Sequence, residues 1–161
     1  GRPAAPERGA SARGGASADS SAEAGGAAGG AGGARARWLK RVEAAELTFV
    51  TFGPVGLAAL EAAQAEPRWA VLDARVLPLD EAAVLEAARG LLITVEEGTS
   101  RGGLGSAVLE LLAARGVSTR VKVVALPSDR FIPHGEARAQ RSELGLDLQG
   151  LRRAAREVLG R

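Results

Sequence analysis

A glycine-rich segment that carries two adjacent carboxylates has the clearest chemical potential in this sequence. Glu96 and Glu97 follow the apolar run 91–95, and residues 98–103 then lead into an Ala/Leu-rich helical pattern. A glycine-rich turn between a strand and a helix is typical of anion binding, because the first N–H groups of a helix have no partner within it. The spacing lacks the third glycine of a dinucleotide-binding fingerprint and the Lys-Ser/Thr pair of a P-loop, so close packing or a subunit interface is favoured over ligand contact. The candidate interface or anion-contact residues here are Glu96, Glu97, Gly98, Arg101, Gly102 and Gly103.

The two glutamates are not expected to work as an acid–base pair. Successive side chains of a strand point to opposite faces, so Glu96 and Glu97 cannot converge on one substrate atom. A carboxylate at the end of a strand is instead expected to meet an arginine or the N-terminus of a helix. We therefore predict no catalytic residue in this segment.

A second segment, residues 129–135, holds the single histidine of the chain, His134. A histidine beside Pro133 and Gly135 could act as a general acid or base, but a surface or interface histidine is the favoured interpretation. With one histidine and no cysteine, the sequence offers little for a histidine-based metal site or a Ser-His triad, and we predict no metal-binding or cofactor-binding residue. The candidate interface or anion-contact residues of this segment are Asp129, Arg130 and His134.

The elements that must position these residues alternate between strands and helices. Short apolar runs predict strands at 47–52, 69–73, 91–95 and 119–126. Helical spacing predicts helices at 55–65, 81–89, 104–115, 138–144 and 147–159, with Asp80 and Asp147 as N-caps. This order indicates an α/β fold, a three-layer and mostly parallel sheet with helices on both faces. Ligands and partners of such a sheet meet the carboxyl ends of its strands, which is where both candidate segments lie.

The first part of the chain has a different composition. Glycine and alanine make up 23 of residues 1–37, too little apolar surface to offset the entropy of ordering, so residues 1–45 are predicted to be a disordered tail or linker before a domain at 46–161. All of the net charge of +2 comes from residues 1–37, and the neutral remainder of the chain, with only five aromatic residues, argues against nucleic-acid binding. The apolar runs fall short of the ~20 residues of a membrane helix. The absence of cysteine fits the cytoplasm, and a methionine-free chain that begins at Gly1 suggests a processed product or a piece of a longer protein.

Several motifs in this order resemble a known family. They are Thr94-Val95-Glu96-Glu97 followed by Gly102-Gly103 and Gly105-Ser106, then Leu72-Asp73-Ala74-Arg75 leading to Pro78-Leu79-Asp80, Leu126-Pro127, residues 131–135, and Glu143-Leu144-Gly145-Leu146-Asp147. Together they resemble the third, carboxyl-terminal domain of transketolase-like enzymes, and most of all that of the 1-deoxy-D-xylulose-5-phosphate synthases. The resemblance covers residues 47–161. It departs from the family at one residue missing between Arg75 and Pro78 and at Ser128, which is inserted.

The resemblance implies a domain of a homodimeric, three-domain enzyme that condenses pyruvate with glyceraldehyde 3-phosphate for isoprenoid precursor synthesis. In that family the other two domains hold thiamine diphosphate and Mg²⁺, and none of their cofactor motifs occurs in this chain. The resemblance therefore implies an assembly or dimerisation domain that has no cofactor and no activity alone, with other domains or subunits as its partners. Two alternatives remain open at this stage, a free-standing α/β module that binds a small anionic ligand and a nucleic-acid accessory protein that uses the tail.

Overall fold

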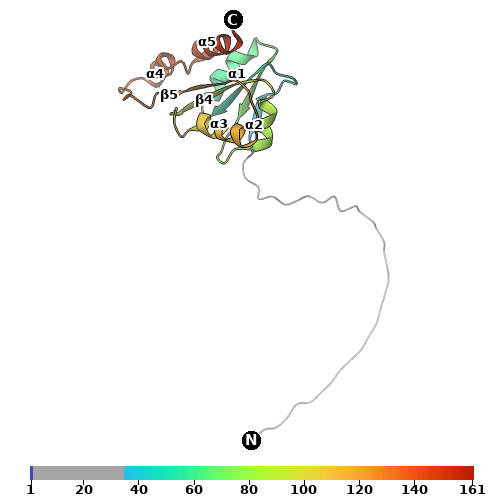
Figure 1. Ribbon diagram of the computed structural model, residues 1–161. Coiled ribbons are helices and arrows are strands. Elements are labelled where there is room, and N and C mark those ends of the chain that lie inside the picture. The colour runs from blue at the N-terminus through green and yellow to red at the C-terminus, as the bar shows by residue number, and fades with distance from the viewer. Residues whose placement is uncertain (2–34) are drawn as a thin grey trace, which may run out of the picture. The chain divides into compact units, whose positions relative to one another are not determined.

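The computed structural model describes Gly1 and residues 35–161, so most of the predicted disordered tail lies outside the described residues. The domain contains one five-stranded sheet in the order β1-β3-β2-β4-β5 (Figure 1). Strands β2 to β5 run parallel to one another, and the edge strand β1 pairs antiparallel with β3. The strands are β1 (Arg37–Lys40), β2 (Leu47–Phe52), β3 (Trp69–Asp73), β4 (Leu91–Thr99) and β5 (Val121–Leu126).

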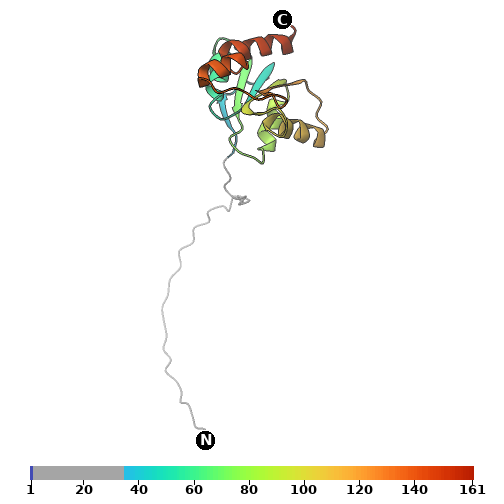
Figure 2. The same cartoon turned by 90° about the vertical axis from the view of Figure 1, so that its left-hand side faces the viewer.

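Helices cover both faces of this sheet, which confirms the predicted three-layer α/β fold. The helices are α1 (Gly56–Gln64), α2 (Glu81–Ala87), α3 (Leu104–Ala114), α4 (Ala137–Glu143) and α5 (Leu148–Leu159). Figures 1 and 2 show α1 and α5 on one side of the sheet and α2 and α3 on the other. No helix among the described residues has the length and apolar character needed to span a membrane.

The alternation of β-strand side chains produces a separate core on each face of the sheet. Phe49 points toward α1 and α5, where its ring meets that of Trp69 edge-on at a centroid distance of 5.9 Å. Its neighbour Val50 joins the other core, with Val84 of α2 and Val108 of α3. Burial on both faces explains why these strands read as nearly continuous apolar runs.

Strand β1 was not predicted from the sequence, and the predicted boundary at residues 45/46 lies too late. Trp38 pairs with Leu72 of β3 and packs against the α2–α3 core. Lys40 Nζ donates to the backbone oxygens of Ala63 and Glu66, each at 2.6 Å, which ties the strand to the end of α1. Four residues of mixed character, next to an Ala/Gly/Arg-rich sequence, carry no periodicity that could have identified an edge strand.

The predicted N-caps are confirmed. Asp80 Oδ1 accepts a hydrogen bond from the backbone N–H of Ala83 at 3.3 Å, and Asp147 Oδ1 accepts one from that of Gly150 at 2.8 Å. Strand β4 is longer than predicted and continues through both glutamates to Thr99. This extension carries the candidate residues beyond the core, toward the carboxyl edge of the sheet.

Candidate functional site

Both candidate segments lie at the carboxyl edge of the sheet, where the segments following β4 and β5 are side by side. The backbone N–H of Ser100 donates to Leu126 O at 2.9 Å, and the Ser100 and Ser128 hydroxyls are 3.4 Å apart. The register shifts between β4 and β5 at this place, so that Thr99 pairs with Leu126. The parallel topology thus brings together two parts of the sequence that the motif analysis treated separately.

Glu96 is buried beneath the N-terminus of α3, with 4% of its surface exposed. Its Oε2 accepts a hydrogen bond from the backbone N–H of Leu104 and its Oε1 one from that of Gly105, both at 2.9 Å. These are N–H groups that a bound anion would otherwise use, and the residue at the N-cap position, Gly103, offers no side chain to satisfy them. Glu96 therefore acts as an internal cap of α3, and its predicted role as a surface contact is corrected.

Two of the predicted contact glycines are explained by this carboxylate. A Cβ atom would lie 2.1 Å from Glu96 Oε2 at Gly103 and 2.6 Å from it at Gly98. The lack of side chains here makes room for Glu96, a packing requirement that needs no ligand. Gly102 has no such neighbour, but its φ of +74° is a conformation that glycine adopts without strain.

Glu97 points away from Glu96, as the strand period predicts, and forms an ion pair with Arg141 of α4. Arg141 Nε donates to Glu97 Oε1 at 2.6 Å. This hydrogen bond and the charge of Glu97 raise the pKa of the Arg141 guanidinium above its ordinary value. The expectation that the two carboxylates meet a helix N-terminus and an arginine is therefore confirmed. Arg141 itself was not predicted, because no sequence pattern links residues 44 positions apart.

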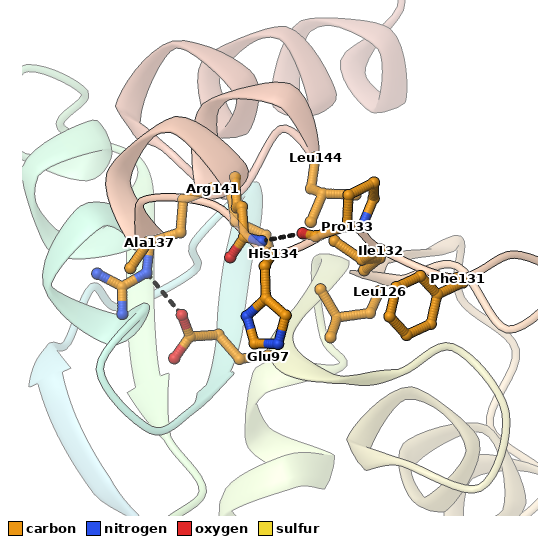
Figure 3. A pocket seen from close by; sticks show the side chains of 11 residues that line it. Glu97, Leu126, Phe131, Ile132, Pro133, His134, Ala137, Arg141 and Leu144 are labelled. Atoms are coloured by element: carbon orange, nitrogen blue, oxygen red, sulfur yellow. Dashed lines mark hydrogen bonds and ion pairs between the residues drawn. The ribbon is translucent and has the colours of Figure 1, made fainter.

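A pocket of about 400 Å³ opens beside this ion pair, between α4, the end of β5 and the segment 131–134. Figure 3 shows the His134 ring between the Glu97 carboxylate and Leu126, with Phe131 at the other end of the pocket from the Arg141 guanidinium. We call this cavity the α4 pocket. It is lined by Glu97, Leu126, Phe131, Ile132, Pro133, His134, Ala137, Gln140, Arg141, Leu144 and Leu146.

A second hollow, of about 420 Å³, lies on the other side of Glu97 and is mostly apolar. Phe52 and Leu77 line it and remain 38% and 53% exposed, while Phe131 beside the α4 pocket is 84% exposed. We call Phe52, Leu77 and Phe131 the apolar edge. Sequence reasoning did not single these residues out as contacts, although each belongs to a strand end or loop marked by a nearby proline.

The remaining predicted residues are charged and exposed. Arg101 lies in the turn after β4, where its backbone oxygen accepts a hydrogen bond from Thr99 Oγ1 at 2.8 Å. Asp129 and Arg130 directly precede Phe131 and are both exposed. None of these three side chains lines the α4 pocket or the second hollow.

The described residues do not fit a Mg²⁺–diphosphate site. No group of three or more metal-ligating side chains occurs among them. Both oxygens of the buried carboxylate Glu96 are taken by backbone N–H groups, and the Arg141 guanidinium is paired with Glu97. No thiamine diphosphate chemistry is therefore assigned to this domain.

Comparison with known proteins identifies the family to which this chain belongs. The chain is 62% identical over 126 residues to the 1-deoxy-D-xylulose-5-phosphate synthase of Myxococcus xanthus, covering 77% of this chain and 21% of that protein. It is 40% identical over 119 residues to the Thermus thermophilus enzyme of the same name, covering 73% of this chain and 19% of that one. The chain thus spans about a fifth of the length of these curated relatives and matches their C-terminal region.

Solved structures give the same result. A structure described as a split gene transketolase, inactive beta4 tetramer, superposes with a TM-score of 0.65 at 33% identity, covering 78% of this chain and 41% of that one. Transketolase from Leishmania mexicana, with a TM-score of 0.54 at 21% identity over 76% of this chain and 18% of that one, shares the fold. The model of the family "Transketolase, C-terminal domain" matches residues 36–151. The chain therefore belongs to the transketolase C-terminal domain family.

Proposed function

We propose that this domain is the assembly module of a homodimeric, thiamine diphosphate- and Mg²⁺-dependent transferase that condenses pyruvate with glyceraldehyde 3-phosphate in isoprenoid precursor synthesis. In this proposal other domains hold the cofactor and metal, and the present chain holds no reacting group. The compartment proposed is the cytoplasm, which a sequence without cysteine fits.

The apolar edge is the observation that carries the proposal. Phe52, Leu77 and Phe131 are exposed on one side of a domain whose two cores are well buried. Apolar side chains gathered around hollows, on a domain that spans a fifth of its relatives, support contact with other parts of such an enzyme at this edge. The buried Glu96–α3 contact fixes the strand and helix ends behind this surface, so the edge is presented by a rigid support.

The alternative of a free-standing anion binder loses its main support. The two backbone N–H groups at the start of α3 already donate to Glu96. The basic side chains near the edge are balanced by acidic neighbours, as the Arg141–Glu97 pair illustrates. The geometry thus favours contact with protein surface over capture of a free anion.

A chimaeric enzyme tests the proposal. The C-terminal region of the Myxococcus xanthus relative that matches this chain is replaced by residues 36–161, and pyruvate consumption that depends on glyceraldehyde 3-phosphate is measured. We expect activity from the chimaera and none from the relative that lacks the region. An active truncated relative, or a folded chimaera without activity, would overturn the proposal.

A matched pair of substitutions locates the assembly surface within the chimaera. Leu77→Asp places a charge in the apolar edge, whereas Leu109→Asp places one at a similarly exposed position of α3; the two leucines are 53% and 46% exposed. Leu77→Asp should lower activity and shift the enzyme toward smaller species in sedimentation. Leu109→Asp should leave both unchanged, and equal effects of the two substitutions would contradict the role of the edge.

A further inference from the structure

A hollow at the amino end of β3, away from the carboxyl edge of the sheet, is lined in large part by arginines. It has a volume of about 450 Å³ and lies between the end of α1, the start of β3 and helix α5 with the residues that follow it. We call this hollow the basic pocket. It is lined by Ala65, Glu66, Trp69, Arg152, Arg156, Leu159 and Arg161.

The charges around the basic pocket are not balanced. Arg68 and Arg161 share a single carboxylate, that of Glu46, at 3.6 and 3.0 Å. Neither Arg152 nor Arg156 forms an ion pair with any residue that the structure describes. The cationic side chains at or beside the pocket are Lys40, Arg68, Arg152, Arg156 and Arg161, and the carboxylates are Glu46 and Glu66. Five positive and two negative charges leave a surplus of three, although residues 38–161 as a whole are neutral.

The stability of the helices does not account for this surplus. A helix dipole favours basic residues in the last turn, which explains Arg156 in α5 but not Arg152, which lies in the first half of that helix. The end of α1 is already bound by Lys40, whose Nζ donates to the backbone oxygens of Ala63 and Glu66, each at 2.6 Å. Two like charges one helical turn apart also destabilise a helix. The arginines of α5 therefore favour an external anion as their partner.

The rest of the lining indicates what kind of anion fits. Guanidinium groups bind phosphate oxygens in pairs, and a dianionic phosphate suits a surplus of positive charge better than a carboxylate does. Ala65, Trp69 and Leu159 add apolar surface beside the arginines, so a ligand with an organic part gains contacts that a bare ion lacks. The volume is within the usual range for small-molecule sites.

We propose that the basic pocket binds a small organic phosphate, with its phosphate group between Arg152 and Arg156 and its organic part against Ala65 and Leu159. This site goes beyond the assembly function, because it involves none of the residues of the apolar edge. It also differs from the anion contact expected after β4, where the free N–H groups of α3 bind Glu96.

NMR titration of the full 161-residue chain tests the site, because the chain contains only two tryptophans. The indole N–H of Trp69 donates to Glu46 at 3.2 Å beside the pocket, whereas Trp38 packs against the core on the other face of the sheet. Phenyl phosphate, inorganic phosphate and benzoate are the probes, each added at a constant, low ionic strength. Phenyl phosphate should shift the Trp69 indole signal and the backbone amides of residues 152–156 in a saturable way, with the Trp38 signal unchanged. It should bind more tightly than inorganic phosphate or benzoate.

Matched substitutions on one helix locate the phosphate group. Arg152→Gln and Arg156→Gln should each raise the dissociation constant of phenyl phosphate about fivefold, as expected for the loss of one exposed charge pair. Arg153→Gln is the control on the same helix, because the Arg153 charge acts on Glu157 and its side chain does not line the pocket. Glu66→Gln removes the carboxylate that lines the pocket and should have the opposite effect, a lower dissociation constant.

Each contrary outcome overturns a stated part of the proposal. No saturable shift with phenyl phosphate would exclude the site. Equal losses of affinity for Arg153→Gln and Arg156→Gln, in variants whose circular dichroism is unchanged, would show a response to general charge and no defined pocket. Benzoate that binds as tightly as phenyl phosphate would exclude a phosphate ligand. The activity of the chimaera is measured separately, so failure of this site leaves the assembly function standing and failure of the assembly function leaves this site standing.

Discussion

Helices α3 and α4 both follow a strand at the carboxyl edge of the sheet, yet they are held in opposite ways. Helix α3 buries four residues, and a carboxylate from β4 caps its N-terminus from within the protein. Helix α4 buries none, has no side-chain cap, and is tied down by contacts at the surface. The adjacent residues Glu96 and Glu97 bind these two helices from opposite faces of β4. Glu96 accepts hydrogen bonds from the start of α3, and Glu97 accepts one from Arg141 of α4. One side of the edge is thus rigid support, and the other is a helix held only by surface contacts.

The largest effect is expected from Glu96→Ala. The substitution leaves the N–H groups of Leu104 and Gly105 buried without their charged acceptor, and hydrogen bonds to charged groups contribute about 1.5–3 kcal/mol each. We expect the free energy of unfolding in urea to fall by about 3–5 kcal/mol. Glu97→Gln, at the neighbouring half-exposed position, is the control and should have a far smaller effect. Similar losses for both variants would remove the contrast between the two sides of the edge.

Gly103→Ala tests the same support from the glycine side. The added methyl group would lie 2.1 Å from Glu96 Oε2, so either the carboxylate or the helix start must move. Overpacking of this kind costs about 1–3 kcal/mol. Gly102→Ala is the matched control, since nothing lies within 4 Å of its Cβ and only the φ of +74° opposes it. Because the φ of −94° at Gly103 imposes no strain on a side chain, a loss for Gly103→Ala no larger than that for Gly102→Ala would show that the Glu96 carboxylate moves aside at little cost.

These contrasts show which parts of the site could be predicted from sequence. The period of a strand sufficed to place Glu96 and Glu97 on opposite faces, and the general behaviour of carboxylates at strand ends suggested an arginine or a helix N-terminus as a partner without saying which glutamate takes which. It could not identify Arg141, because the partner of an ion pair depends on how distant segments fold together. The reason for Gly103 was likewise hidden, since it depends on the position of a carboxylate seven residues earlier.

The apolar edge was missed for a different physical reason. Pattern analysis assigns large apolar residues to the core, and the run that ends at Phe52 fits this rule up to its last residue. Whether the final side chain is covered depends on the neighbouring loops, which short-range patterns do not determine. Strand β1 was missed because its stability comes from pairing with β3 and from the Lys40 contacts, and not from its own composition.

Asp147→Ala probes the junction between α4 and α5. Asp147 accepts hydrogen bonds from the Gly150 N–H and the Ser142 hydroxyl, and the Gly150 bond is the main cause that lowers the pKa of its carboxyl below the ordinary value. A lowered pKa in the folded state means that this stabilisation is present above the unfolded-state pKa of about 3.9 and is lost as the pH falls through the folded-state pKa. Removal of the cap should cost about 1 kcal/mol at neutral pH.

The pH dependence supplies the check on that assignment. Unfolding in urea is compared for the wild type and Asp147→Ala at pH 7 and at pH values below 4. The difference between the two proteins should shrink as the pH falls, because the wild type then loses the contribution of the ionised cap. A difference that is constant over this range would mean that the carboxylate charge has no part in holding the start of α5.

Arg141→Gln is expected to change the free energy of unfolding of the domain least, and to act mainly on helix α4. The Arg141 side chain is partly exposed, so its ion pair with Glu97 should add little to the free energy of unfolding of the whole domain. It is, however, one of few contacts that hold α4, a helix with no buried residue. Hydrogen exchange should therefore accelerate at the amides of α4 while those of α3 keep their protection. Faster exchange in both helices would show that α4 is part of the cooperative core, and a surface built from it would then be as rigid as the one behind Glu96.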